Sequence, residues 1–192
     1  MNATWQSLRQ ATQPMHQQLE RVPVLARLFA DDCRRDELAL VLKGMAMVHG
    51  GLEPMLERSQ AARAIGYRPR LPLLRAALAA LEHALPEGHC TCDVSLHAPA
   101  REWGALYVVE GAILGGEVIR RRLIDQFGES IAPALAFFTP YGSQAGAQWV
   151  RFRDGLARHA APPDALAEAV DAAAQTFALF AQVLTGMHKI GG

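Results

Sequence analysis

Apolar side chains recur every three or four residues along most of the 192-residue chain, the spacing that gathers them on one face of an α-helix. Strict alternation of apolar and polar residues, the pattern of a half-buried strand, forms no convincing run. The clearest helical face lies near the C-terminus and is formed by Leu166, Val170, Ala173, Ala174, Phe177, Phe180, Ala181 and Leu184. The pattern therefore predicts an all-α protein.

Proline and glycine divide this pattern into helical segments. Pro14 is expected to kink the first segment or to open its second part, and the second segment is expected to break near Gly50-Gly51 or Pro54. The last helix begins at residues 162–164 and is expected to end near Thr185, closed by Gly186. The other expected helices cover residues 4–21, 35–64, 73–85, 99–127 (ending at Gly128), 131–138 and 143–159. No internal repeat is evident, so we expect residues 1–192 to form a single-domain multi-helix bundle of seven to nine helices.

Composition and charge exclude several classes of protein. Hydrophobic residues make up 51% of the chain, enough for a sizeable core, and 19 basic residues balance 19 acidic ones. This balance argues against a nucleic-acid-binding protein, which usually carries a strongly basic face. Three cysteines are too few for a disulfide scaffold, and neither a signal peptide nor a membrane-spanning apolar run is found. We expect a soluble, reduced, cytoplasmic protein that binds neither nucleic acid nor a membrane.

The segment from residue 103 to 119 carries four glycines inside a helical pattern, although each costs up to about 1 kcal/mol relative to alanine. At the helical angle per residue, Gly104, Gly111 and Gly115 fall within roughly 40° of one another. Gly116 lies beside them and allows the backbone to bend. The spacing predicts a groove without side chains, which either packs tightly against another helix or accepts a flat ligand. Two adjacent glycines favour the ligand.

His16 and Glu20 lie one helical turn apart on the same predicted face. A neutral imidazole is the usual ligand for heme iron in oxygen-handling proteins, and a carboxylate beside the other ring nitrogen would fix its tautomer. A single histidine is more often a surface or core residue. The spacing alone leaves both interpretations open.

Two other clusters resemble metal sites less closely. His89-Cys90-Thr91-Cys92, with His83 and His97, leaves only one residue between its cysteines, whereas structural zinc sites usually leave two to four. His49 and Glu53 have helical spacing, but di-iron bundles typically use Glu-x-x-His pairs, which this chain lacks. We interpret the first cluster as a loop with incidental thiols and expect no di-iron site.

Two motifs together resemble the heme oxygenase family, most closely the compact bacterial enzymes that supply biliverdin, including those associated with bacteriophytochromes. They are Arg9–Glu20 and Glu110–Gly116, and their order and separation make the pair specific. Weaker likenesses occur at residues 40–57, 140–142, 149–152 and 176–177. The resemblance implies a heme oxygenase-like all-α fold. It also implies cleavage of heme, which is both substrate and cofactor, to biliverdin, CO and ferrous iron with O2 and an external reductant.

The resemblance also implies roles for particular residues. His16 is expected to bind the heme iron, and Gly111, Gly115 and Gly116 to lie on the distal side. Arg9 is expected to pair with one heme propionate and Arg151 or Arg153 with the other, since arginine suits carboxylates. The residues expected to hold heme are Arg9, Thr12, His16, Glu20, Tyr107 and Arg151, and those expected at the reacting face are Gly111, Ala112, Gly115 and Gly116.

Ala112 departs from the family pattern, in which mammalian members have aspartate and many bacterial members serine at this position. The family's chemistry needs a path of water molecules that delivers protons at the iron, and alanine cannot hold such a water. The path would then depend on backbone carbonyls or on Tyr107, Gln144 or Gln148. Without it, one alternative is a non-catalytic heme-binding or heme-trafficking protein of the same fold. Another is a helical interaction module whose glycines pack against a partner helix.

The implied partners follow from what the chain lacks. No nucleotide-binding motif is present, so electrons are expected from a separate ferredoxin or reductase. Arg120-Arg121-Arg122 forms either a solvated face or a docking patch for an acidic donor. The likeness to bacteriophytochrome-associated members adds a phytochrome that accepts biliverdin as a further expected partner.

Overall fold

The computed structural model describes residues 3–190, and this part of the chain contains helices and no strand. This confirms the predicted all-α class. The α-helices are α1 (Ala3–Glu20), α2 (Pro23–Ala26), α3 (Arg35–Leu56), α4 (Gln60–Ile65), α5 (Leu71–Ala80), α6 (Pro99–Phe127), α7 (Ala145–His159) and α8 (Pro163–Ile190). Three 3₁₀ segments join them: η1 (Arg27–Phe29), η2 (Glu129–Phe138) and η3 (Gly142–Gln144).

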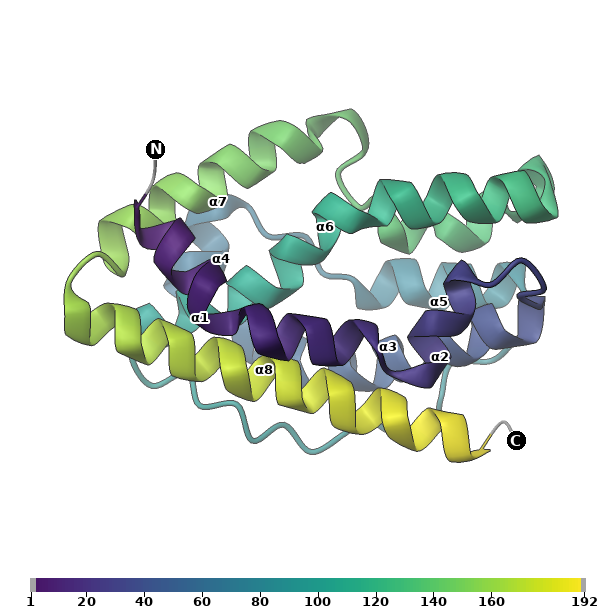
Figure 1. The fold of residues 1–192 in the computed structure, drawn as a ribbon, viewed down its shortest axis with the longest axis horizontal. Helices are drawn as coiled ribbons and strands as arrows, with labels where there is room; N and C mark the ends of the chain where they lie inside the picture. The colour runs from purple at the N-terminus through teal and green to yellow at the C-terminus, as the bar shows by residue number, and fades with distance from the viewer. Residues whose placement is uncertain (1–2, 191–192) are drawn as a thin grey trace.

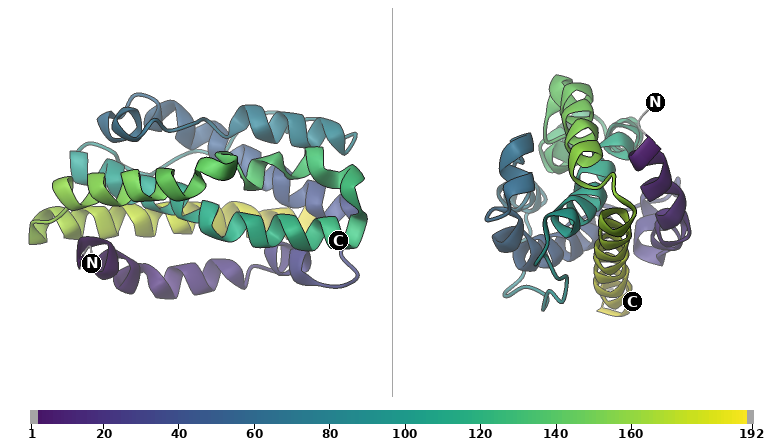
Figure 2. Two further views of the ribbon diagram at one scale, coloured as in Figure 1. Left: turned by 90° about the horizontal axis from the view of Figure 1, so that it is seen from above. Right: turned by 90° about the vertical axis from the view of Figure 1, so that its left-hand side faces the viewer.

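The two long helices α6 and α8 pack together near their N-terminal ends and diverge toward their C-terminal ends (Figure 1). The end-on view shows α6 between α1 on one side and α4 and α5 on the other (Figure 2). A side chain at Gly104 would overlap the carbonyl oxygen of Ala169, so this glycine is what brings the two helices together. Because α1 also packs along α8, it is held facing the middle of α6.

The predicted α6 is confirmed at both ends, beginning at Pro99 and ending at Phe127. Gly128 follows with φ +79°, a conformation that glycine adopts without strain. Helix α1 is continuous through Pro14, so this proline opens no second helix. Its only buried residues are Leu8 and Thr12, which leaves most of its length free to line a surface or a cavity.

The predicted break in the second helix was placed too early. Helix α3 continues through Gly50, Gly51 and Pro54 to Leu56, and α4 begins after Ser59, whose hydroxyl accepts a hydrogen bond from the Ala62 amide at 3.0 Å. A Cβ at Gly51 would lie 2.5 Å from the Cys90 carbonyl oxygen. The glycine pair therefore admits the 89–92 loop to the helix surface and does not interrupt the helix.

Other expected boundaries were also wrong. Helix α5 ends at Ala80, not Leu85, and the chain then passes through Glu82 with φ +62°. Helix α8 does not end at Gly186 but continues to Ile190. Leu184 and Met187 pack over Gly44 of α3, so the apolar face of α8 extends past the glycine. Tertiary packing overrides the local helix-ending signal there. The short segments α2 and η1 were not predicted.

Within residues 3–190, no helix is both long and apolar enough to cross a bilayer.

Candidate functional site

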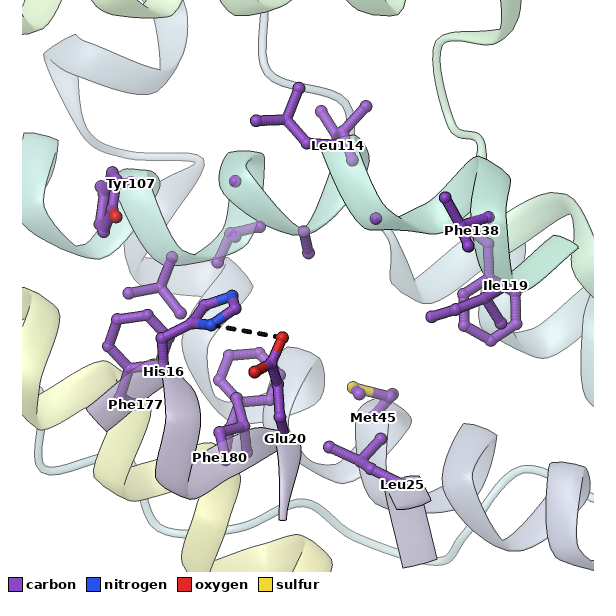
Figure 3. A pocket seen from close by; sticks show the side chains of 18 of the residues that line it. His16, Glu20, Leu25, Met45, Tyr107, Leu114, Ile119, Phe138, Phe177 and Phe180 are labelled. Carbon is purple, nitrogen blue, oxygen red and sulfur yellow. Dashed lines mark ion pairs between the residues drawn. The ribbon is translucent and has the colours of Figure 1, made fainter. Parts of the chain in front are cut away.

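A cavity of about 850 Å³ lies between α1 and the middle of α6, within the range of about 300–1,000 Å³ typical of ligand sites (Figure 3). One wall comes from α1, one from α6, and the floor from apolar residues of α3, η2 and α8. The predicted site residues that line it are Arg9, His16, Glu20, Tyr107, Gly111, Ala112 and Gly115. Residues far apart in the sequence thus meet across one space.

His16 projects from α1 into this space. Its Nδ1 lies 3.5 Å from Glu20 Oε1, and its ring meets the ring of Phe177 edge to face at 5.9 Å between centroids. Figure 3 shows the other ring nitrogen directed away from Glu20, on the side of α6. An imidazole held at Nδ1 keeps the lone pair of Nε2 available to a metal ion.

The facing wall of α6 has bare backbone at Gly111 and Gly115, where no atom lies within 4 Å of an added Cβ. Gly104 and Gly116 behave differently. A side chain at Gly104 would overlap Ala169, and one at Gly116 would overlap the carbonyl oxygen of Phe138. The glycine segment therefore combines both interpretations: Gly111 and Gly115 open onto the cavity, and Gly104 and Gly116 permit close packing. Gly116 does not line the cavity, contrary to the expectation that it faces the ligand.

Arg9 and Tyr107 line one end of the cavity, near Trp5. The Arg9 guanidinium lies 5.6 Å from the centre of the Trp5 ring. Thr12 is buried behind this wall, where its hydroxyl donates to the Leu8 carbonyl at 2.8 Å and lies 3.5 Å from the Tyr107 hydroxyl. Thr12 therefore supports Tyr107 and does not line the cavity itself.

Arg151 lies outside the cavity, which corrects its expected place beside a bound ligand. Its guanidinium Nη1 is 3.4 Å from the Ile65 carbonyl oxygen and 3.3 Å from Gln148 Oε1. Arg153, the other candidate, lies over the Trp5 ring at 5.7 Å, close to the Arg9 end. Helix α7 turns these two arginines in different directions because they are two residues apart.

Of the polar side chains expected to compensate for Ala112, only Tyr107 lines the cavity. Gln144 is exposed, and Gln148 is buried among polar groups behind the wall. Ala112 itself is exposed at the cavity edge. Further polar atoms reach the cavity from elsewhere in the fold.

They do so from a buried wall that includes His49 of α3, which is 3% exposed. His49 Nδ1 lies 3.2 Å from Glu53 Oε1, and Glu53 also accepts hydrogen bonds from the Tyr67 hydroxyl at 2.8 Å and from the Arg70 and Leu71 amides. Burial lowers the pKa of His49, although Glu53 opposes this. A neutral imidazole that donates from Nδ1 leaves Nε2 as an acceptor.

Arg70 is the second polar residue of this wall. Its Nη2 lies 2.6 Å from Oε1 of Glu110, which is fully buried. The Tyr141 hydroxyl donates to the same oxygen at 3.0 Å, and Gln148 donates to Oε2 at 3.2 Å. Burial raises the pKa of Glu110, and Arg70 opposes that rise. Each member of this network has a partner, as buried polar groups require.

The sequence interpretation missed Arg70 and assigned Glu110 no role beyond the motif. One signal was present: a carboxylate inside an apolar helical segment is costly to bury unless a cation or several donors meet it. Glu110 therefore indicated a buried partner. Nothing in the local sequence identified that partner as Arg70.

The cavity also carries exposed apolar side chains. The most exposed large hydrophobic residues of the described chain are Phe29 (52%), Leu114 (54%), Val118 (62%) and Val150 (47%), and the first three line the cavity. Unpartnered apolar surface beside a concave wall is typical of a binding site.

The arginine run after the glycine segment is engaged in ion pairs. Arg120 and Arg121 lie 3.4 Å and 2.9 Å from Glu117, and Arg122 lies 2.8 Å from Asp31. For this run the structure favours a solvated, self-paired face. In the part of the chain described, no group of three or more His, Cys, Asp or Glu side chains could hold a metal ion.

Comparisons with known proteins agree on one family. Residues 2–90 and 80–186 match the family model described as heme oxygenase. A curated heme oxygenase of Xanthomonas campestris pv. campestris (strain 8004) is 35% identical over 118 residues, which cover 59% of this chain and 66% of that protein, just under two thirds. The heme oxygenase of Neisseria meningitidis, solved with NO and CO bound, superposes with a TM-score of 0.77 at 19% identity, covering 97% of this chain and 92% of that one. This last likeness establishes the fold.

Proposed function

The chain belongs to the heme oxygenase family, and from this premise we propose that it cleaves heme to biliverdin, CO and ferrous iron, using O2 and electrons from an external donor. The observation that carries the proposal is the cavity between the His16 imidazole and the bare backbone at Gly111 and Gly115. A planar ligand fits between these walls because neither glycine has a side chain in its way. When bound, heme supplies the iron at which O2 is reduced and the porphyrin carbon that is attacked.

In this proposal His16 holds the iron through Nε2. Glu20 lies 3.5 Å from Nδ1, keeps the proton on Nδ1 and fixes the ring orientation. This makes Nε2 a better electron-pair donor to the iron. Phe177 supports the ring from the side. These residues position heme and perform no proton transfer.

The buried polar wall takes the place of the polar side chain that Ala112 lacks. His49 and Arg70 both line the cavity, and Glu53 and Glu110 fix their orientations. Nε2 of His49 can accept a hydrogen bond from a water in the cavity, and the Arg70 guanidinium can donate one. Such a water is held at two points and can pass protons toward the reacting face. Tyr107 is the remaining polar group on the wall.

Arg9 is proposed to pair with a heme propionate, because it provides a cation on the cavity wall. Arg153, above the shared Trp5 ring, is better placed than Arg151 for the second propionate. Two cations beside the same ring match a porphyrin, which carries both propionates on one edge.

We extend the proposal to the setting of the reaction. A ferredoxin or a reductase would supply the electrons, a phytochrome would accept biliverdin, and the chain would act in the cytoplasm as one heme oxygenase-like domain. The match of the family model to nearly the whole chain supports the single domain. The resemblance to biliverdin-supplying bacterial enzymes supports the partners.

Hemin titration followed by reductive turnover tests the proposal. We expect a Soret band on adding hemin, loss or shift of that band in His16→Ala, and biliverdin absorbance after ascorbate or a ferredoxin system is supplied. Arg151→Ala, which changes a residue outside the cavity, should behave like the parent protein. A Soret band without biliverdin would make the chain a heme-binding or heme-trafficking protein, and the absence of any band would refute the proposed site.

A further inference from the structure

A series of neighbouring aromatic rings connects the cavity wall to the protein surface. Tyr107 lines the cavity and contacts Phe152 at 6.5 Å between ring centroids. Phe152 contacts Trp103 at 5.8 Å, and Trp103 stacks on His159 at 5.4 Å with the ring planes 8° apart. Trp103 is only 2% exposed, whereas His159 is exposed. We call Tyr107, Phe152, Trp103 and His159 the ring relay.

The position of Trp103 depends on a glycine in the neighbouring helix. A side chain at Gly155 of α7 would overlap the six-membered ring of Trp103, so the indole lies directly on the α7 backbone. This glycine is central in a helix and has no turn to form, and it costs stability relative to alanine. The close approach it allows seats Trp103 between Phe152 and His159.

All three tryptophans of the chain belong to the same contact network. Trp149 stacks on Phe152 at 5.1 Å, and Trp5 meets Trp149 at 6.3 Å. Both line the cavity, so they form a branch that returns to it. Among the described residues, the branch through Trp103 leads away from the cavity to the exposed ring of His159.

We propose that the ring relay carries electrons from Trp103 to the heme pocket when a peroxide is reduced there without a donor protein. This inference rests on the proposed function, because incomplete reduction of O2 at heme is a source of peroxide. Tyrosine and tryptophan are the aromatic side chains that lose an electron most readily. Phe152, with its ring centroid 6.5 Å from that of Tyr107 and 5.8 Å from that of Trp103, gives electrons a short path between them.

The electrons and protons that the peroxide takes up come from Trp103 and water. The peroxide takes up two electrons and two protons, its O–O bond breaks, and two waters form. Tyr107 twice loses an electron with its phenolic proton, and each time it regains an electron from Trp103 and a proton from solvent, so it is unchanged at the end. Trp103 and one water supply the two electrons and two protons: an indole C–H bond breaks, a C–O bond to the water oxygen forms, and hydroxytryptophan results.

Burial makes Trp103 a selective reporter. Trp103 is only 2% exposed, so dilute peroxide attacks it directly less than it attacks Trp5 and Trp149 on the cavity wall. Water is in large excess over peroxide and adds to the ring once it has been oxidised. Oxygen taken from water distinguishes oxidation by electron loss from direct transfer of a peroxide oxygen. Labelled water therefore identifies the route.

The experiment adds hydrogen peroxide to the heme-loaded full chain in oxygen-18 water, without O2 or a reductant, and analyses the peptides by mass spectrometry. We expect one labelled oxygen atom on Trp103. Phe152→Leu, which breaks the bridge, and Tyr107→Phe should reduce this product to the level of heme-free protein. Trp149→Phe removes an oxidisable cavity ring but leaves the relay intact, so its Trp103 product should persist.

A second measurement covers the case in which Phe152→Leu fails to fold. Trp103→Phe keeps a ring in place but removes the terminal electron source, so a tyrosyl radical should persist longer in electron paramagnetic resonance than in the parent protein. With normal Soret and biliverdin signals, any of three results would overturn the relay. They are unoxidised Trp103, unlabelled oxygen on Trp103, and an unchanged Trp103 product in a folded Phe152→Leu protein. Absence of the Soret band would instead refute the proposed function.

Discussion

Among single residues, His49 has the clearest dependence on pH. Burial lowers its pKa from the ordinary value of 6.5, so the unfolded chain takes up a proton below that pH before the folded chain does. Stability therefore falls as the pH drops below about 6.5, by up to about 1.4 kcal/mol per pH unit for one proton. Urea unfolding between neutral pH and pH 5 should show this slope, and His49→Gln should flatten it.

Neighbouring carboxyl groups bear on the same measurement. Glu53 has a lowered pKa and loses its contribution only at more acidic pH, below its ordinary value of 4.5. Glu110 has a raised pKa and acts in the opposite direction, because burial favours its neutral form. Equal slopes for the parent protein and His49→Gln above pH 5 would show that His49 is not the titrating group.

The Arg70–Glu110 pair gives a second prediction at this scale. Arg70→Met leaves a buried carboxylate without its cation and should destabilise the protein by about 3–5 kcal/mol, as measured by urea unfolding at neutral pH. Adding Glu110→Gln removes the unpaired charge and should restore much of this loss. If the double variant were as unstable as the single one, packing and not charge would explain the effect.

Among the elements, α6 provides matched glycines for a direct comparison. Gly111→Ala and Gly115→Ala place a methyl group in open space and should stabilise the ligand-free fold by about 0.5–1 kcal/mol through helix propensity. Gly104→Ala and Gly116→Ala force a methyl group onto backbone atoms, which cannot rotate away, and should destabilise it by about 1–3 kcal/mol. Thermal unfolding would separate the two pairs.

The alanine variants at 111 and 115 should affect hemin affinity in the opposite direction to stability. An alanine at 111 or 115 narrows the cavity where a flat ligand would lie, so it should weaken hemin binding while it strengthens the helix. A protein stabilised by Gly115→Ala with unchanged hemin affinity would show that the ligand does not approach this backbone.

The elements also show what the sequence could and could not predict. Helical periodicity and its proline and glycine limits located α6 correctly, because local signals and packing agree there. The same signals failed at Gly50-Gly51, where the 89–92 loop packs against the glycines, and at Gly186, where the flanking Leu184 and Met187 pack on α3 and keep the helix intact. A glycine in the sequence therefore does not reveal whether anything packs against it, or what does.

The same limit applies to the site. Spacing within one helix brought His16 and Glu20 together correctly, because it depends only on helical geometry. The separate expectation for Arg151 depended on how α7 is rotated against the rest of the fold, and that is set by long-range packing. Arg70 reaches the cavity through its pairing with Glu110, forty positions along the chain, which no local pattern encodes.

For the molecule as a whole, the cavity is a concave surface that carries much of the exposed apolar area. Phe29, Leu114 and Val118 expose apolar surface along its walls, so a ligand that covers them should favour the folded state. A ligand that binds only the folded chain stabilises it by about 2.7 kcal/mol at a free concentration one hundred times its Kd. Hemin should therefore raise the unfolding midpoint progressively with its concentration.

Leu114 and Val118 should each contribute to this rise. Leu114→Ser and Val118→Ser reduce the apolar surface that hemin covers without altering the core, because both side chains are mostly exposed. Each should lower the hemin-dependent rise in the unfolding midpoint but leave the hemin-free midpoint nearly unchanged. Val150→Ser is the matched control, since Val150 is similarly exposed but lies outside the cavity. If Val150→Ser lowered the rise as much as Leu114→Ser, hemin would be binding to exposed apolar surface in general and not within this cavity.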